Sequence, residues 1–212
     1  MPELSIMHGQ TDRRRILVLF AHPALEKSRV NRRLIRTIED LDGVTINDLY
    51  ESYPDFDVDI EREQALLVGH DFIVLQHPFY WYSAPALLKE WMDLVLEHGW
   101  AYGAGGNALR GKKAMSAITV GGSEASYSIA GLNHFTIRQL LAPIEQAFRL
   151  CGVKYLPPFV VHGTHQLGDS AMADHERAYQ QVIRALRDDR IDFEVVSDSS
   201  RINQHLDDIT GE

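Results

Sequence analysis

Short apolar runs alternate along the chain with segments in which apolar residues return every three or four positions. The runs have the length of a strand and no polar alternation, which is typical of strands buried on both faces of a sheet. They span residues 16–21, 44–49, 72–76, 113–120 and 155–161. The segments with helical spacing span residues 28–38, 60–68, 86–96, 137–150 and 173–187. This order predicts an α/β protein with a doubly wound, five-stranded parallel sheet and helices on both faces.

The two ends of the chain lack this pattern. Residues 1–14 are a polar lead-in, and residues 191–212 mix charged residues and serine with few apolar ones. We therefore expect one domain over residues 15–190, followed by a weakly ordered tail. Within the last strand, the pair Pro157-Pro158 cannot donate hydrogen bonds, which predicts an irregular or edge strand.

Composition narrows the class of protein. A hydrophobic content of 45% in 212 residues is enough for one full core. The net charge of −9 argues against a nucleic-acid binder, because phosphate recognition needs clustered positive charge. The single cysteine, Cys151, excludes an internal disulfide, and His162 and His165 lack an evident third metal ligand, so we predict no metal. No run of ~18 apolar residues is present, so we expect a soluble cytoplasmic protein.

The most unusual stretch is an aromatic elbow between the strand at 72–76 and the helix that follows Pro85. It consists of Phe79, Tyr80, Trp81 and Tyr82. Open α/β sheets bind ligands at the carboxyl ends of their strands, so the elbow could stack on a flat cofactor. The alternative is a domain edge or a dimer contact, because aromatic residues are also enriched at interfaces.

Two further loops follow strands at the same edge of the predicted sheet. The first, from His22 to Asn31, brings Ser28 and Asn31 to the start of a helix, where backbone N–H groups, aided by Arg29, can hold a phosphate. An ordinary N-cap at Ser28 explains this loop equally well. No Walker or dinucleotide glycine pattern is present, which favours a monophosphate. The second loop, Thr119 to Gly122, could bring bare backbone to a ring edge, or could be a simple tight turn.

Together these motifs resemble the flavodoxin-like NAD(P)H:quinone oxidoreductase family, and within it most the ancillary flavoproteins of glutathione-regulated potassium-efflux systems. The resemblance covers roughly residues 15–190 and is carried by five stretches. They are residues 22–31, 53–56, 77–91, 98–103 and 119–122.

The resemblance implies three sets of flavin contacts. The phosphate and ribityl chain would lie against His22, Ser28, Arg29, Val30 and Asn31. The face of the isoalloxazine ring would lie against Phe79, Tyr80, Trp81 and Tyr82. The ring edge would lie against Thr119, Val120, Gly121 and Gly122.

The resemblance also implies an activity and partners. The cofactor would be FMN, or alternatively FAD, with NADPH or NADH as electron donor and a quinone as acceptor, in a two-electron ping-pong cycle. A homodimer with shared active sites is implied, with Trp100 and Tyr102 of a glycine-rich flap lining the partner's pocket. The alternative is a regulatory subunit that binds a membrane potassium-efflux protein at the inner face of the cell membrane, with a structural or sensory flavin.

Two positions depart from the family pattern. The family often has two threonines before the glycine pair, whereas Val120 follows Thr119 here, so one side-chain contact to the flavin is in doubt. The family's tyrosine and histidine donors to the flavin map to Tyr127 and to Asn133, with His134 one place later. We predict Tyr127, alone or assisted by His134, as the catalytic donor. The alternative is that Tyr127 only lines the pocket and His134 caps the next helix.

Overall fold

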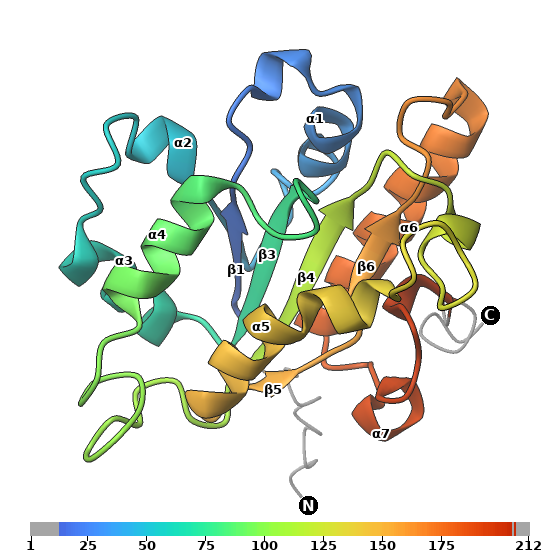
Figure 1. Ribbon diagram of the computed structural model, residues 1–212. Coiled ribbons are helices and arrows are strands. Elements are labelled where there is room, and N and C mark those ends of the chain that lie inside the picture. The colour runs from blue at the N-terminus through green and yellow to red at the C-terminus, as the bar shows by residue number, and fades with distance from the viewer. Residues whose placement is uncertain (1–12, 205, 207–212) are drawn as a thin grey trace, which may run out of the picture.

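A parallel sheet forms the centre of the protein (Figure 1). The structure is a computed structural model that describes residues 13–204 and 206. Its strands are β1 (Ile16–Phe20), β2 (Val44–Asp48), β3 (Phe72–Pro78), β4 (Lys113–Thr119), β5 (Lys154–Tyr155) and β6 (Phe159–Val161). The spatial order is β2-β1-β3-β4-β5, and β6 also pairs with β4. This is the strand order of a flavodoxin-like doubly wound sheet, and it confirms the predicted fold class.

The helices form a layer on each face of the sheet (Figure 1). One layer contains α2 (Leu49–Ser52), α3 (Ile60–Gly69), α4 (Ala86–Val95) and α5 (Ile137–Leu150). The other contains α1 (Arg29–Arg36) and α6 (Asp169–Arg187). Leu17 and Leu19 of β1 pack into the first layer, whereas Ile16, Val18 and Phe20 pack into the second. Because both faces of β1 are covered, its sequence is apolar without alternation.

The last strand of the sheet is interrupted at the two prolines. β5 ends at Tyr155 and β6 begins at Phe159, and both pair in parallel with β4. The irregular strand predicted from Pro157-Pro158 is therefore confirmed. α6 begins at Asp169, about one turn before the predicted start at residue 173.

The described part of the C-terminal segment is attached to the fold, in contrast to the weakly ordered tail expected from its composition. Helix α7 (Phe193–Val196) and the 3₁₀ turn η3 (Ile202–Gln204) follow α6. Ile191, Val196 and Ile202 are buried against the layer that contains α1 and α6. A few spaced apolar residues are enough to attach the segment, although its overall composition is polar. The lead-in at residues 1–12, residue 205 and residues 207–212 lie outside the described residues.

No helix within residues 13–204 combines the length and the apolar character that a membrane span needs.

Candidate functional site

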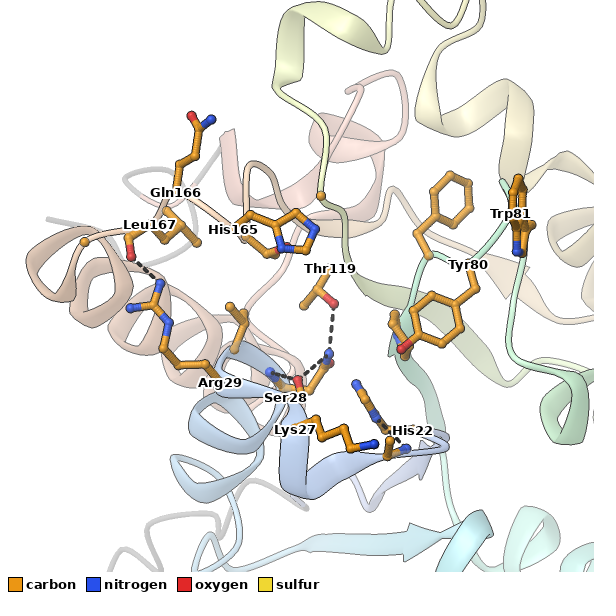
Figure 2. Close-up of a pocket in the computed structure, with 18 residues that line it drawn as sticks. His22, Lys27, Ser28, Arg29, Tyr80, Trp81, Thr119, His165, Gln166 and Leu167 are labelled. Atoms are coloured by element: carbon orange, nitrogen blue, oxygen red, sulfur yellow. Dashed lines mark hydrogen bonds between the residues drawn. The ribbon is translucent and has the colours of Figure 1, made fainter.

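A pocket of about 870 Å³ opens at the carboxyl ends of the strands. Loops that follow β1, β3, β4 and β6 form its walls, because parallel strands all end at the same edge. Figure 2 shows polar and charged residues on one side of this pocket and Tyr80 and Trp81 on the other. The lining residues are His22, Ala24, Lys27, Ser28, Arg29, Val30, Asn31, Pro78, Phe79, Tyr80, Trp81, Thr119, Gly121, Thr164, His165, Gln166, Leu167 and Gly168.

The polar side is built on the start of α1. Ser28 is the N-cap, and its Oγ accepts a hydrogen bond of 3.1 Å from the backbone N–H of Asn31. Lys27 and Arg29 flank this cap, so two cations stand beside the positive end of the helix dipole. The Arg29 guanidinium also donates to the backbone carbonyl of Leu167, which ties the loop after β6 to the start of α1 (Figure 2). This side of the pocket is suited to an anionic group.

Asn31 connects the polar side to β4. Its side chain is buried, and Nδ2 donates a 2.8 Å hydrogen bond to Thr119 Oγ1. Its Oδ1 is buried without a hydrogen-bond partner in the described part of the chain. An unpaired buried acceptor costs about 1–3 kcal/mol, and a hydroxyl or N–H donor of a ligand in the pocket would satisfy this atom. A phosphate dianion has no such donor, whereas a sugar or ribityl chain has several.

His22 lines the pocket as a neutral imidazole. Burial, the largest effect, lowers its pKa, although nearby Glu26 opposes the shift. The backbone N–H of Ala24 donates to His22 Nδ1 at 3.1 Å. Because Nδ1 accepts, the neutral ring carries its proton on Nε2, which is left as a donor. Its ring meets Tyr80 edge to face with centroids 6.2 Å apart, so His22 lies between the polar and aromatic sides.

The aromatic elbow turns sharply at the rim of the pocket. Trp81 and Tyr82 have φ values of 50° and 62°, a left-handed conformation that is rare for bulky side chains. Ser83 N donates to Tyr80 O at 3.0 Å and closes the turn. Phe79 points into the core, whereas the Trp81 side chain is 93% exposed. The strained backbone thus holds an indole ring in the open at the pocket rim.

The glycine turn after β4 allows two close approaches. A Cβ at Gly121 would lie 2.8 Å from His165 Nε2, and a Cβ at Gly122 would lie 3.1 Å from the Tyr127 ring. Gly121 lines the pocket, but Val120 and Gly122 do not. The Val120 N–H donates to Val161 O at 2.9 Å, so this backbone group serves the sheet rather than the pocket.

The structure brings most of the predicted contact residues together. His22, the residues from Ser28 to Asn31, the residues from Phe79 to Trp81, Thr119 and Gly121 all line the pocket. Tyr82 does not, since its hydroxyl donates to Asn133 Oδ1 at 3.1 Å on the loop after β4.

The two predicted catalytic residues lie outside the pocket lining. Tyr127 is near it, because its ring lies 6.2 Å from Phe79 and 5.8 Å from His162. His134 is exposed and does not line this pocket. The alternative role for His134 as a helix cap is wrong, because Thr136 caps α5 in a capping box with Gln139.

Sequence reasoning missed the fourth wall of the pocket. Residues 164–168 follow β6 and contribute His165 and Gln166, and Lys27 was also overlooked. The position of residues 164–168 after a predicted strand could have placed them at the pocket, because the loop after any parallel strand reaches the same edge of the sheet. The spacing of His162 and His165 favoured a surface or pocket pair over a metal site, and His165 does line the pocket. Among residues 13–204, no group of three or more His, Cys, Asp or Glu residues is placed to hold a metal ion.

Comparison with known proteins decides the family. The family described as having a flavodoxin-like fold matches residues 14–185. The chain belongs to this family. The resemblance drawn from the loop motifs is thereby confirmed.

Relatives within the flavodoxin-like family have informative names. The glutathione-regulated potassium-efflux system ancillary protein KefF of Klebsiella aerogenes is 45% identical over 166 residues, covering 78% of this chain and 93% of that protein. An NADPH-quinone reductase from P. pentosaceus is 35% identical with a TM-score of 0.73, covering 79% and 96%. General stress protein 14 from Treponema denticola, solved in complex with FMN, is 34% identical with a TM-score of 0.75, covering 81% and 97%.

Proposed function

We propose that the chain binds FMN in the pocket and acts as an NAD(P)H:quinone oxidoreductase with a two-electron ping-pong cycle. The observation that carries the proposal is the buried, unpartnered Oδ1 of Asn31 between an anion-suited side and an aromatic side. The FMN-bound structure of general stress protein 14 and the NADPH-quinone reductase support it. FAD remains the alternative cofactor, and NADH the alternative donor.

The anion-suited side, Asn31 and the aromatic side follow one another along the pocket, in the same order as the phosphate, the ribityl chain and the ring of FMN. The start of α1, with Ser28, Lys27 and Arg29, would hold the phosphate. Asn31 Oδ1 would accept from a ribityl hydroxyl, and His22 Nε2–H would donate nearby. Tyr80 and Trp81 would cover the ring face, and Thr119 and Gly121 its edge, with Val120 and Gly122 supporting the turn.

The chain's own residues would bind, orient and shield the reacting groups. When bound, the flavin supplies the two-electron chemistry, taking hydride from NADPH or NADH and passing both electrons to the quinone. The exposed Trp81 ring at the rim offers a flat apolar surface for a planar nicotinamide or quinone. Phe79, the buried residue of the elbow, would anchor the elbow to the core.

Tyr127 is the proposed hydrogen-bond donor at the aromatic side. Burial, followed by the neighbouring Tyr82, raises its pKa, so its hydroxyl stays protonated at neutral pH. Tyr127→Phe keeps the ring and removes the donor, and we expect reduction of the bound flavin by NADPH in stopped-flow to slow by about 10-fold. His134→Ala tests the assisting role and, from its exposed position, should leave the rate unchanged. An unchanged rate in Tyr127→Phe would remove the residue from catalysis.

A second candidate function is regulatory. The 45% identity to KefF favours an ancillary subunit that binds a membrane potassium-efflux protein, and such a partner would bring this chain to the inner face of the cell membrane. In that case the flavin would be structural or sensory. The exposed apolar side chains Trp81 and Leu132 provide a surface for such a partner.

One experiment separates these functions. The purified protein should be yellow, and chromatography of the flavin released on denaturation should show FMN. NADPH or NADH should bleach the flavin band, and a benzoquinone should restore it. A colourless protein that neither FMN nor FAD reconstitutes contradicts both functions. A bound flavin that neither nucleotide reduces would favour the regulatory subunit.

A further inference from the structure

The C-terminal strap, residues 192–204, lies beyond the 14–185 family match, and its residues 202 and 203 lie at the outer edge of β6. Ile202 N donates to Pro158 O at 2.9 Å. The Asn203 side chain pairs twice with the backbone of Val160, accepting from its N–H at 3.2 Å and donating to its carbonyl at 3.0 Å. Ile202 itself is fully buried. The strap is therefore anchored to the sheet by backbone pairing and by apolar burial.

From this anchor, two arginine contacts reach the Tyr127 loop, residues 120–136, and the helix after it. Arg201 forms a hydrogen-bonded ion pair with Glu124, near the start of the loop. Arg138, at the start of α5, donates to Ser197 O at 2.7 Å and to Ser199 O at 3.1 Å. The hydrogen bond from Arg201 is the largest effect that lowers the pKa of Glu124, so the pair is ionised at neutral pH. Both ends of the loop are thus tied to the strap.

The middle of the Tyr127 loop contacts the aromatic elbow. The Tyr127 ring lies 6.2 Å from Phe79, and Asn133 Oδ1 accepts from the Tyr82 hydroxyl at 3.1 Å. Much of the remaining loop faces solvent, with the side chains of Ile129 and Leu132 73% and 82% exposed. Beyond Gly122, whose carbonyl accepts from Gly163 N at 2.9 Å, the hydrogen bonds of the loop are largely local, such as Asn133 N to Ser126 O at 3.0 Å. The position of the loop relative to the sheet therefore depends strongly on its ties to the strap.

We propose that the C-terminal strap positions the Tyr127 loop against the aromatic elbow, with Arg138 and Arg201 as positioning residues. An exposed ion pair alone restrains little, so the restraint comes from both arginine contacts together with the Asn203 anchor. Release of the strap would let the loop drift and widen the aromatic side of the pocket. The consequence for quinone binding rests on the proposed function, whereas the restraint on the loop does not.

Hydrogen exchange tests the restraint directly. In the double variant Arg201→Met/Asn203→Ala, the amides of residues 123–135 should exchange about three- to tenfold faster than in the wild type. Amides at the start of α1 should be unaffected. Arg190→Met is the matched control, because Arg190 pairs with Asp188 at 3.6 Å and makes no contact with the loop. Unchanged exchange of the loop in the double variant would overturn the proposal.

A shortened chain that ends at Ser197 gives an independent test. It removes Arg201, Ile202 and Asn203 together but keeps the buried Ile191 and Val196. If this chain folds by circular dichroism and its loop amides exchange at wild-type rates, the strap does not position the loop. If it does not fold, the double variant still decides the question.

Activity measurements test the link to quinone binding. In the flavin-loaded double variant we expect the quinone KM to rise about threefold or more, with the FMN Kd unchanged, because the strap does not touch the polar side of the pocket. Faster loop exchange with an unchanged KM would overturn that link. A protein without flavin or activity would contradict the proposed function and leave the exchange result standing.

Discussion

Asn31 is the residue on which flavin binding should depend most. It carries the unpartnered acceptor and also bonds Thr119, while Ser28 caps α1 beside it. Ser28→Ala with Asn31→Ala should raise the FMN Kd at least tenfold, since each removes a contact worth roughly 1.5–3 kcal/mol. Quenching of flavin fluorescence measures this. Ser126→Ala is the control, because its hydroxyl bonds that of Ser123 at 2.9 Å and does not line the pocket. Undiminished FMN affinity in the double variant would refute the placement of the phosphate and ribityl chain.

His77 should make the fold sensitive to acid. It is fully buried at the end of β3, its Nδ1–H donates to Pro78 O at 3.0 Å, and burial lowers its pKa to about 4. Between pH ~6.5 and 4, His77 binds a proton in the unfolded chain, where its pKa has the ordinary value near ~6.5, but stays neutral in the folded chain. The free energy of unfolding is therefore largest above pH ~6.5 and falls by up to about 3 kcal/mol as the pH drops toward 4.

His77→Leu tests this acid sensitivity by urea unfolding between pH 7 and 4.5. The variant should lose a large part of the decrease in unfolding free energy, because a leucine takes up no proton. His98→Gln is the comparison, since His98 is exposed. The same pH slope in His77→Leu and the wild type would show that His77 does not control it.

The sequence predicts which residues lie near the pocket, but not which way their side chains point. Ser28, Asn31 and Tyr80 follow strands of the sheet, and this position alone brings them to one edge. Whether Tyr82 faces the pocket depends on the left-handed backbone at Trp81 and Tyr82, which places the Tyr82 hydroxyl against Asn133 instead. Such loop conformations arise from tertiary contacts that hydrophobic periodicity does not contain.

Helix α3 is held by a buried carboxylate. Glu63 is fully buried, and its carboxylate accepts from Asn47 Nδ2 at 2.7 Å, from the Tyr53 hydroxyl at 2.6 Å and from Trp91 Nε1 at 2.8 Å. It also forms an ion pair with Arg62. These partners belong to β2, to the end of α2 and to α4, so a single side chain joins α3 to three neighbouring elements.

Removal of this carboxylate should loosen the whole layer. Glu63→Ala leaves several buried donors without an acceptor, so we expect a loss of about 3 kcal/mol or more in urea unfolding. Glu61→Ala is the matched control on the same helix and should change stability by less than about 0.5 kcal/mol, because Glu61 is exposed. A Glu63 variant as stable as the Glu61 variant would contradict the role of the network.

Elements were predictable where burial sets the pattern. The strands are predictable as continuous apolar runs because helices cover both faces of the sheet. The pair Pro157-Pro158 predicts the break between β5 and β6. Glu63 was not recognised, because a carboxylate in an amphipathic helix normally faces water. The C-terminal segment was expected to be weakly ordered because its composition is polar. Its few apolar residues, such as Val196 and Ile202, are nevertheless buried.

At the scale of the whole molecule, the exposed apolar residues predict a homodimer. Trp81, Leu132 and Ile129 are 93%, 82% and 73% exposed, on the elbow and the Tyr127 loop. Trp100 and Tyr102 are partly buried against their own core, and their place at a partner's pocket stays a prediction. A second copy that covers the rim would bury the exposed residues beside the pocket, which suits a shared active site.

Light scattering should therefore give a mass near twice 24.0 kDa. Ile129→Glu with Leu132→Glu should shift the protein toward the monomer by placing charges in the contact. Val68→Glu is the control, an exposed apolar position at the end of α3, which leads into the start of β3, whereas the elbow follows the end of that strand. A strict monomer with full activity contradicts the dimer.

The paired prolines and Asn203 also determine how copies of the protein can meet. Pro157 and Pro158 have no N–H to offer, and the Asn203 side chain occupies both polar groups of Val160 on the outer edge of β6. A strand of another copy would find no free backbone N–H at these positions to pair with, which opposes extension of this end of the sheet by β-augmentation. A chain cut short of Asn203 would uncover the polar groups of Val160, and the two prolines would then have to keep a second strand from this edge without the asparagine.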